Sequence, residues 1–369
     1  MFVLYILSTA TLSYLFFSFL FRKFKIDNFT FNIFFLLKFV YLLLYIYSHY
    51  NNFGTDALAY YNKAENYNIG SLPISENLIY GINLFFRNFY NIKFESLNIA
   101  TFFISFSSCL LLLSLIKDLD KFQKIAICIT LLIPSLNFFT SALNKDMLIF
   151  FSLSLFLYSL LNKKNNLLVL SIILAFLIRP YVCFVILASY IICKVLFSIK
   201  EIIIDHKISL KFILIRIFFL ILSILIIYFI LDNLLGSFGK YFLKGNILAI
   251  VDNLQSHYSN TTLGIPVDTN ISTRLIKYAF FPTIFDLVDF NIFFIILIIE
   301  NTFLIFVFIY FILRFRFSDI NNQYKFIAIV SFIMLYFVLA LVTSNSGIAI
   351  RQKWMVLPFL LILFSKKLS

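Results

Sequence analysis

Long apolar stretches separated by short polar or basic connections follow one another along almost the whole chain. A helix that crosses the hydrocarbon core of a bilayer needs about 20 predominantly apolar residues. The stretches that approach this length are Phe2–Leu20, Phe31–Tyr47, Leu97–Ile116, Ile125–Phe139, Met147–Leu161, Leu167–Ile178, Val182–Phe197, Phe212–Leu231, Ile292–Leu313, Phe326–Val342 and Trp354–Phe364. The pattern predicts an all-α polytopic integral membrane protein with about eleven transmembrane helices, in a range of about ten to twelve.

The composition supports the same fold class and excludes two others. Of the 369 residues, 62% are hydrophobic and 13% are charged, and the mean hydropathy is +0.99. Soluble domains carry about 25% charged residues. These values exclude a water-soluble globular domain and a disordered chain, and we expect residues 1–369 to form a single transmembrane domain.

The basic residues predict the orientation of the chain in the membrane. The net charge of +13 does not point to nucleic acid, because most Lys and Arg residues lie between apolar stretches. Cytoplasmic connections of membrane proteins are enriched in these residues. The basic connections are Arg22–Lys25, Lys117–Lys124, Lys163–Lys164, Lys194–Arg216, Arg314–Lys325 and Lys366–Lys367. Strict alternation then places the N-terminus outside and the C-terminus in the cytoplasm.

Two long connections fall on the outer side in this topology, residues 48–96 and 232–291. Both are polar with moderate apolar content, as at Leu58–Tyr61, Leu78–Phe86 and Ile247–Leu254. Such segments are typical of short amphipathic helices that lie on the membrane surface.

Motifs for cofactors and metals are absent from the sequence. It contains neither a GxxxxGK[ST] nor a GxGxxG pattern, so we expect no chemistry driven by ATP or GTP. The four cysteines form no CxxC pair, the three histidines are scattered, and no carboxylates are paired at metal-ligand spacing. We therefore expect no cofactor, no metal and no disulfide.

The first candidate residue is Asp56, which follows Gly54-Thr55 near the start of the first long connection. A carboxylate at the membrane interface suits a general base or a metal ligand. The alternative is that Asp56 caps a surface helix that starts with Ala57-Leu58.

The short connection Thr140–Asp146 holds two further candidates. Its length keeps its polar residues close to the lipid headgroups. Lys145 is a compact cation that suits a phosphate ligand, with Asp146 beside it as a substrate-binding residue. The alternative is an interfacial turn in which Asp146 caps the next helix.

Two arginines stand beside apolar stretches on the outer side. Arg179-Pro180 interrupts an apolar run, and Arg351 precedes the last one. An unpaired Arg in the bilayer costs about 2.5–3.5 kcal/mol on insertion scales, so such a residue usually faces a cavity or an anion. The alternatives are snorkelling for Arg179 and interfacial anchoring for Arg351, together with Lys353 and Trp354.

The remaining candidates are more isolated. The second long connection holds Arg274 and His257, and His257 suits a general base or a solvated loop residue. Glu300 and Lys38 lie within predicted spans, where an ionisable residue points to function. Lys38 can also snorkel to the cytoplasmic side, and a pair between Lys38 and Glu300 is a further hypothesis.

These segments together resemble the Wzy-type polymerases of O-antigen and capsular repeat units and their EpsG-like relatives. The motifs are Gly54-Thr55-Asp56 with Tyr60 and Tyr61, Ser141 with Asn144-Lys145-Asp146, Arg179-Pro180, and Asn345, Gly347 and Arg351 ahead of Pro358. Membrane glycosyltransferases of the GT-C type often carry a catalytic carboxylate in the first outer loop, which is similar in position to Asp56. The essential arginines in late outer loops of some polymerases point to Arg274.

The resemblance implies a glycosyltransferase in the bacterial inner membrane with its active site on the periplasmic face. It would transfer a glycan from undecaprenyl diphosphate to the next lipid-linked repeat unit. Asp56, Arg179 and Arg351 would be catalytic, and Lys145, Asp146, Arg274, His257 and Tyr60 would bind substrate. The implied partners are undecaprenyl-diphosphate-linked oligosaccharide, the lipid bilayer and a chain-length regulator protein, with no nucleic acid.

Other function classes stay open. A GT-C-type transferase of single sugars from a polyprenyl-phosphate donor fits Asp56 equally well. A flippase for lipid-linked oligosaccharides usually shows internal repeats and polar residues at the midplane, of which only Glu300 is visible. A ligase or a membrane acyltransferase would require a histidine pattern that His49 and His257 do not form.

Overall fold

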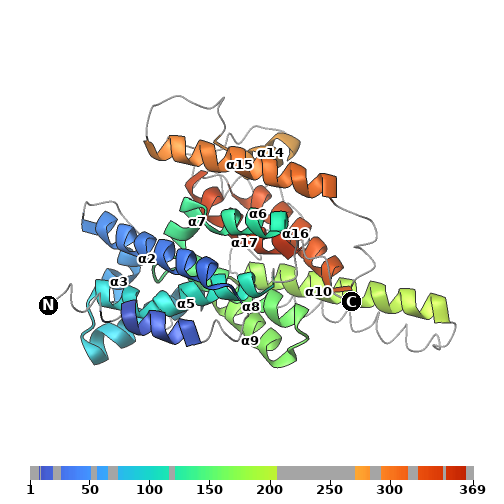
Figure 1. The fold of residues 1–369 in the computed structure, drawn as a ribbon. Helices are drawn as coiled ribbons and strands as arrows, with labels where there is room; N and C mark the ends of the chain where they lie inside the picture. The colour runs from blue at the N-terminus through green and yellow to red at the C-terminus, as the bar shows by residue number, and fades with distance from the viewer. Residues whose placement is uncertain are drawn as a thin grey trace. The chain divides into compact units, whose positions relative to one another are not determined.

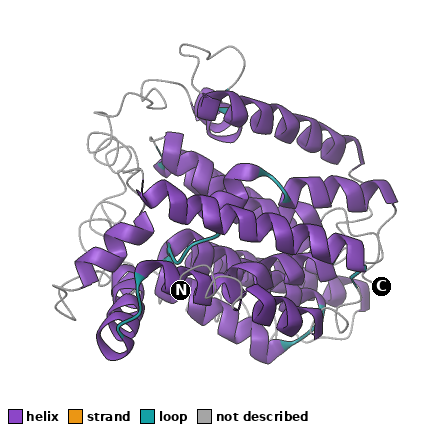
Figure 2. Ribbon diagram, turned by 60° about the vertical axis from the view of Figure 1, so that its left-hand side comes forward, coloured by secondary structure: helices purple, strands orange, loops and turns teal. Residues whose placement is uncertain are grey.

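The computed structural model of the protein describes residues 8, 10–19, 26–50, 56–64, 74–115, 121–205, 271–282, 292–314, 323–343 and 346–362. Their regular structure is helical, and no strand occurs among them (Figure 2). Within these ranges, four helical segments are long and apolar enough to cross a membrane: Asn28–Ser48, Phe94–Ser114, Pro180–Phe197 and Gln323–Ala340. The predicted all-α membrane fold is confirmed at this level, while the number of spans and the orientation stay predictions.

The described chain divides into two compact units at Pro180/Tyr181, and Figure 1 labels helices of both. The first unit contains α2 (Asn28–Tyr50), α3 (Asp56–Lys63), α4 (Ile74–Leu84), the π-helix η2 (Phe85–Phe89), α5 (Phe94–Ser114), α6 (Lys121–Leu131), α7 (Pro134–Phe139), α8 (Lys145–Leu161) and α9 (Asn165–Ile178). α10 (Pro180–Asp205) starts at the boundary. The second unit continues with α14 (Ile271–Phe280), α15 (Ile292–Arg314), α16 (Gln323–Val342) and α17 (Ser346–Ile362).

α8 is the central helix of the first unit. It packs against α5 and α9, and most of its side chains are buried. Small hydroxyl residues allow helices to approach closely in an apolar environment and to bond across the contact. Ser152 on α8 does this, because its Oγ donates a 2.7 Å hydrogen bond to the carbonyl of Ser171 on α9.

Phenylalanine rings join α2 to α5 in the same unit. Phe35 lies edge-on to Phe102 and Phe106, with ring centroids 5.5 and 5.3 Å apart. Phe31 also meets Phe106 edge-on at 5.6 Å. These offset arrangements place the positive edge of one ring against the negative face of another. The contacts fix α2, and with it Lys38, against α5.

The predicted span Ile125–Phe139 is wrong as a continuous helix. α6 ends at Leu131 and α7 starts at Pro134, which lacks the backbone N–H that a helix interior requires. The Nδ2 group of Asn137 donates to the carbonyls of Leu131 and Ile133, each at 2.9 Å. The amide therefore satisfies carbonyl groups that the break exposes inside the protein.

Other local predictions agree with the described residues. Short helices do form in the two long connections: α3, α4 and η2 in the first, and α14 in the second. The predicted break at Arg179-Pro180 is confirmed, since α9 ends at Ile178 and α10 starts at Pro180. α17 starts at Ser346, ahead of the predicted span Trp354–Phe364, while Ile247–Leu254 lies outside the described residues.

The short helix α14 contacts three other helices of the second unit, α15, α16 and α17. α16 contacts α14 and α17, and α14 also contacts α15 (Figure 1). Tyr336 on α16 donates its hydroxyl hydrogen bond to the carbonyl of Leu275 on α14. Its ring meets that of Tyr278 edge-on, with centroids 5.7 Å apart. Both contacts hold the short α14, which carries Arg274, on the longer apolar helix.

Candidate functional site

The turn between α7 and α8, residues 140–144, is held by buried polar side chains of α2 and α5. Lys38 donates from Nζ to the hydroxyl of Thr140, and Ser105 donates to the carbonyl of Thr140 at 2.6 Å. The backbone N–H of Leu143 donates to Oδ1 of Asn98 at 2.8 Å. The prediction that Lys38 snorkels is wrong, because the residue is 1% exposed and is bound to this turn.

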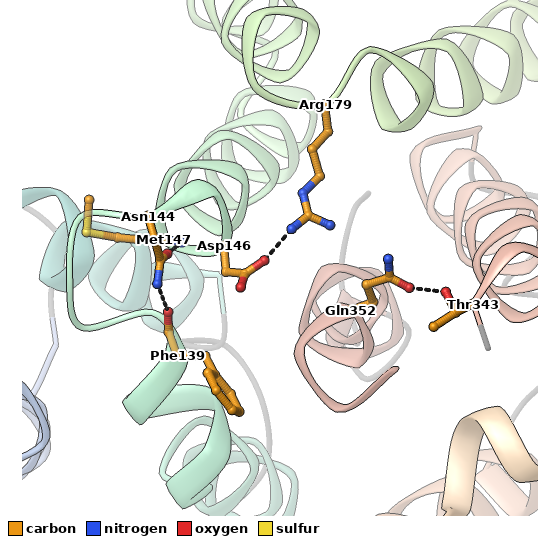
Figure 3. A network of polar contacts seen from close by, with 7 residues as sticks. All are labelled: Phe139, Asn144, Asp146, Met147, Arg179, Thr343 and Gln352. Atoms are coloured by element: carbon orange, nitrogen blue, oxygen red, sulfur yellow. Dashed lines mark hydrogen bonds and ion pairs between the residues drawn. The ribbon is translucent and has the colours of Figure 1, made fainter. Parts of the chain in front are cut away.

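Asn144 starts α8 and fixes the direction of the residues that follow. Its Oδ1 accepts a 2.7 Å hydrogen bond from the backbone N–H of Met147, and its Nδ2 donates to the carbonyl of Phe139 at 2.8 Å (Figure 3). The cap of this helix is thus Asn144, and the alternative that Asp146 caps it is wrong. Asp146 instead lies in the first turn, where the helix dipole favours a carboxylate.

Asp146 forms an ion pair with Arg179 (Figure 3). Nη2 of Arg179 donates to Oδ1 of Asp146, and the two side chains are 15% and 8% exposed, respectively. Arg179 has extended backbone, with φ −143° and ψ 87°, because it joins the end of α9 to Pro180. The sequence predicted that this arginine faces a cavity or an anion, and in the structure a carboxylate of the same unit lies beside it.

The helix that starts with Asp56 packs against the turn that precedes Lys145. Ala57 of α3 is buried in one cluster with Tyr45, Phe94 and Ala142. Ala142 belongs to the turn before α8. The cluster therefore joins the first long connection, which carries Asp56, to the segment that carries the candidates Lys145 and Asp146. Asp56 itself is exposed at the start of α3.

Lys145 and Tyr60 meet at this contact. Nζ of Lys145 lies 5.7 Å from the centroid of the Tyr60 ring, within the range of a cation–π interaction. Tyr60 also meets Tyr80 of α4 edge-on at 5.4 Å. The structure therefore brings together, in the first unit, the elements that carry Asp56, Tyr60, Lys145, Asp146 and Arg179. The sequence alone could not establish this proximity.

The other predicted site residues belong to the second unit or are not described. Arg351 lies on α17 and is partly exposed. Arg274 lies on α14, and its backbone alone is described. His257 lies outside the described residues, so its predicted role stays a prediction.

A buried polar cluster lies in the second unit, and its centre is Lys353. Nζ of Lys353 donates to the carbonyl of Phe281 at 3.0 Å and to Oδ1 of Asn301 at 2.9 Å. Nδ2 of Asn301 in turn donates to the carbonyl of Pro282 at 2.9 Å. The alternative of interfacial anchoring does not describe Lys353, because this side chain is buried, with 8% of it exposed.

Glu300 adds a negative charge to this cluster. It is 6% exposed and interacts electrostatically with Lys353. Lys38 and Glu300 each have another partner in their own unit, so the hypothesis of a pair between them gains no support. Next to Lys353, Gln352 accepts a hydrogen bond at Oε1 from the hydroxyl of Thr343 (Figure 3). The signals in the sequence were Glu300 within a predicted span and the polar triplet Arg351-Gln352-Lys353 before an apolar run, but neither showed that these residues meet.

In the part of the chain that the structure describes, no three or more His, Cys, Asp or Glu side chains gather as metal ligands would. The first unit instead offers two cations and two carboxylates at the ends of short helices. A guanidinium binds phosphate oxygens through paired N–H groups, and an ammonium adds a compact positive charge. An exposed carboxylate such as Asp56 can accept a proton from a hydroxyl group.

Replacement of Asn144 tests how far the cap positions the site. Asn144→Ala removes the acceptor for the N–H of Met147, and loss of such a cap costs about 0.5–2 kcal/mol. We expect a lower midpoint of thermal unfolding in detergent micelles, with Asn144→Asp retaining most of the stability since Asp is an equally good cap. Equal midpoints for both variants would contradict a capping role.

Comparisons of the chain with protein-family models, with curated proteins and with solved structures find no match.

Proposed function

We propose that this membrane protein joins undecaprenyl-diphosphate-linked oligosaccharide repeat units into a surface polysaccharide, an O-antigen or a capsule. The reaction takes place at the periplasmic face of the inner membrane. The donor is a glycan on polyprenyl diphosphate, and the acceptor is the terminal sugar of another lipid-linked unit. A chain-length regulator protein is a partner in this proposal.

The observation that carries the proposal is the cluster of charged residues in the first unit. Arg179 and Lys145 stand at ends of helices, and the elements of Asp56, Tyr60 and Asp146 pack beside them. A lipid with an anionic diphosphate headgroup combines the two properties that such a site selects, an apolar tail and concentrated negative charge.

Each of these residues has a separate role in the proposed glycosyl transfer. The acceptor hydroxyl oxygen attacks the anomeric carbon, and the bond from that carbon to the diphosphate oxygen breaks with its electron pair going to the diphosphate. Arg179 and Lys145 stabilise the negative charge that develops on the leaving group. Asp56 accepts the hydroxyl proton. Arg351, Arg274 and His257 stay predicted ligands for the diphosphate or the sugars, on the sequence pattern alone.

The decisive experiment is a gel of surface polysaccharide from a strain that lacks this gene, with and without complementation. A polymerase defect leaves single repeat units, which are made, exported and attached but not joined. We therefore expect the ladder of longer chains to disappear and a single-unit band to remain. An intact ladder with one altered sugar would favour a GT-C-type single-sugar transferase and contradict polymerisation.

A second candidate, a flippase for lipid-linked oligosaccharide, is favoured by the cluster of Glu300, Asn301 and Lys353. Transporters place polar groups and irregular backbone carbonyls among their membrane helices, and Lys353 binds the carbonyl of Phe281 after α14. Loss of all surface repeat units in the same deletion strain would favour this function.

A further inference from the structure

The carboxylate of Asp146 lies where Arg179 would otherwise receive a phosphate oxygen. Nη2 of Arg179 donates to Oδ1 of Asp146, and both side chains are largely buried. An arginine binds a carboxylate and a phosphate through the same planar set of N–H groups. Any anionic ligand of Arg179 must therefore compete with Asp146 for it.

We propose that Asp146 makes this site selective for diphosphate lipids against the singly charged phospholipids of the membrane. The inference rests on the proposed function, since it takes Arg179 to be a ligand of the lipid diphosphate. Asp146 is then a specificity-determining residue that acts through Arg179. It excludes ligands whose affinity for the guanidinium is no higher than that of the Asp146 carboxylate.

The charges of the competing groups explain the selection. A phospholipid such as phosphatidylglycerol carries one negative charge, as Asp146 does, so exchange of one for the other gains little and brings two like charges together. A polyprenyl diphosphate carries at least two charges on two linked phosphates. It can bind Arg179 with one phosphate and Lys145, the neighbour of Asp146, with the other. Specificity of this kind comes from a repulsive group built against the competitor.

The surrounding structure holds Asp146 in place for this role. The cap at Asn144 and the bonds of Lys38 and Ser105 to Thr140 fix the turn ahead of α8. Asp146 therefore stands next to Arg179 with little freedom to move away. Anionic lipid headgroups are attracted to Lys and Arg residues at a membrane surface. An Arg179 without this carboxylate would attract them in the same way.

The test uses the purified full-length protein in lipid nanodiscs and measures binding of undecaprenyl diphosphate. Nanodiscs of phosphatidylcholine alone are compared with nanodiscs that contain added phosphatidylglycerol. For the wild-type protein we expect phosphatidylglycerol to change the Kd less than twofold. For Asp146→Asn we expect it to raise the Kd about tenfold, a size typical of coupling between ligands.

Two variants serve as matched controls. Asp146→Glu keeps the charge and should behave like the wild type. Asp27→Asn removes one carboxylate elsewhere in the first unit, where Oδ2 of Asp27 accepts from the N–H of Thr30 at the start of α2. Partial desolvation opposes ionisation of Asp27. Hydrogen bonds from Thr30 and from the Asp27 backbone, together with the charge of Lys124, outweigh it and keep the pKa of Asp27 below its ordinary value. Since Asn caps helices as well as Asp does, this variant should stay insensitive to phosphatidylglycerol.

The outcomes separate this inference from the proposed function. Wild-type binding of undecaprenyl diphosphate with no added sensitivity in Asp146→Asn would overturn the role of Asp146 and leave the polymerase proposal standing. Absence of binding by the wild type would overturn both. Should Asp146→Asn fold poorly, Asp146→Ser provides the same comparison. Sensitivity in Asp27→Asn as well would show an effect of net charge and would also overturn the inference.

Discussion

Arg179→Ala is expected to abolish the polysaccharide ladder while the protein still accumulates in the membrane. The substitution removes the guanidinium that binds the leaving diphosphate, and loss of one such stabilising group typically lowers turnover by about 100- to 1,000-fold. The measurement is the surface-polysaccharide gel of a deletion strain complemented with the variant, together with quantification of the protein in the membrane fraction.

A paired substitution separates lost chemistry from lost folding. Arg179→Ala leaves the largely buried Asp146 carboxylate without its cation, which is destabilising in itself. In Arg179→Gln/Asp146→Asn both charges are removed, so the protein should be stable and still make no ladder. A normal ladder from this double variant would rule out Arg179 as a ligand of the diphosphate. We also expect no ladder from Asp56→Asn or Arg351→Ala, and normal polymer from these and Arg179→Ala alike would reject the site assignment.

Lys353→Ala is expected to lower the free energy of unfolding more than Asn144→Ala does. Lys353 binds the carbonyl of Phe281 and Oδ1 of Asn301, and it interacts with the charge of Glu300. Removal of one partner from a buried pair typically costs about 3–5 kcal/mol, because the remaining charge loses its buried counter-charge. The measurement is the midpoint of thermal unfolding of the purified protein in detergent micelles.

Lys277→Ala is the matched control for this prediction. Lys277 lies in the last turn of α14 and is partly exposed, so its loss should change the midpoint little. Lys353→Ala/Glu300→Gln should recover part of the stability, because the buried negative charge of Glu300 is removed together with its cation. Equal midpoints for Lys353→Ala and Lys277→Ala would show that the buried cluster contributes little to stability.

The sequence by itself determined the fold class and some of the positions at which helices break. Apolar stretches of near-spanning length predict helices, and the structure has them at Asn28–Tyr50, Phe94–Ser114 and Gln323–Val342. Proline marks breaks without reference to the rest of the chain, because it lacks an N–H group and fixes φ. Pro180 was recognised in this way, whereas the equivalent effect of Pro134 was overlooked within an apolar run.

Only the tertiary structure decided which polar groups meet. Asp146 and Arg179 are 33 residues apart in the chain, Lys38 and Thr140 are 102 apart, and Lys353 and Asn301 are 52 apart. In a soluble helix, the alternation of polar and apolar residues reveals the buried face. In a membrane protein, the faces toward lipid and toward protein are both apolar, so this signal is lost. The packing of the helices then determines the partner of each buried charge, and local sequence patterns do not predict that packing.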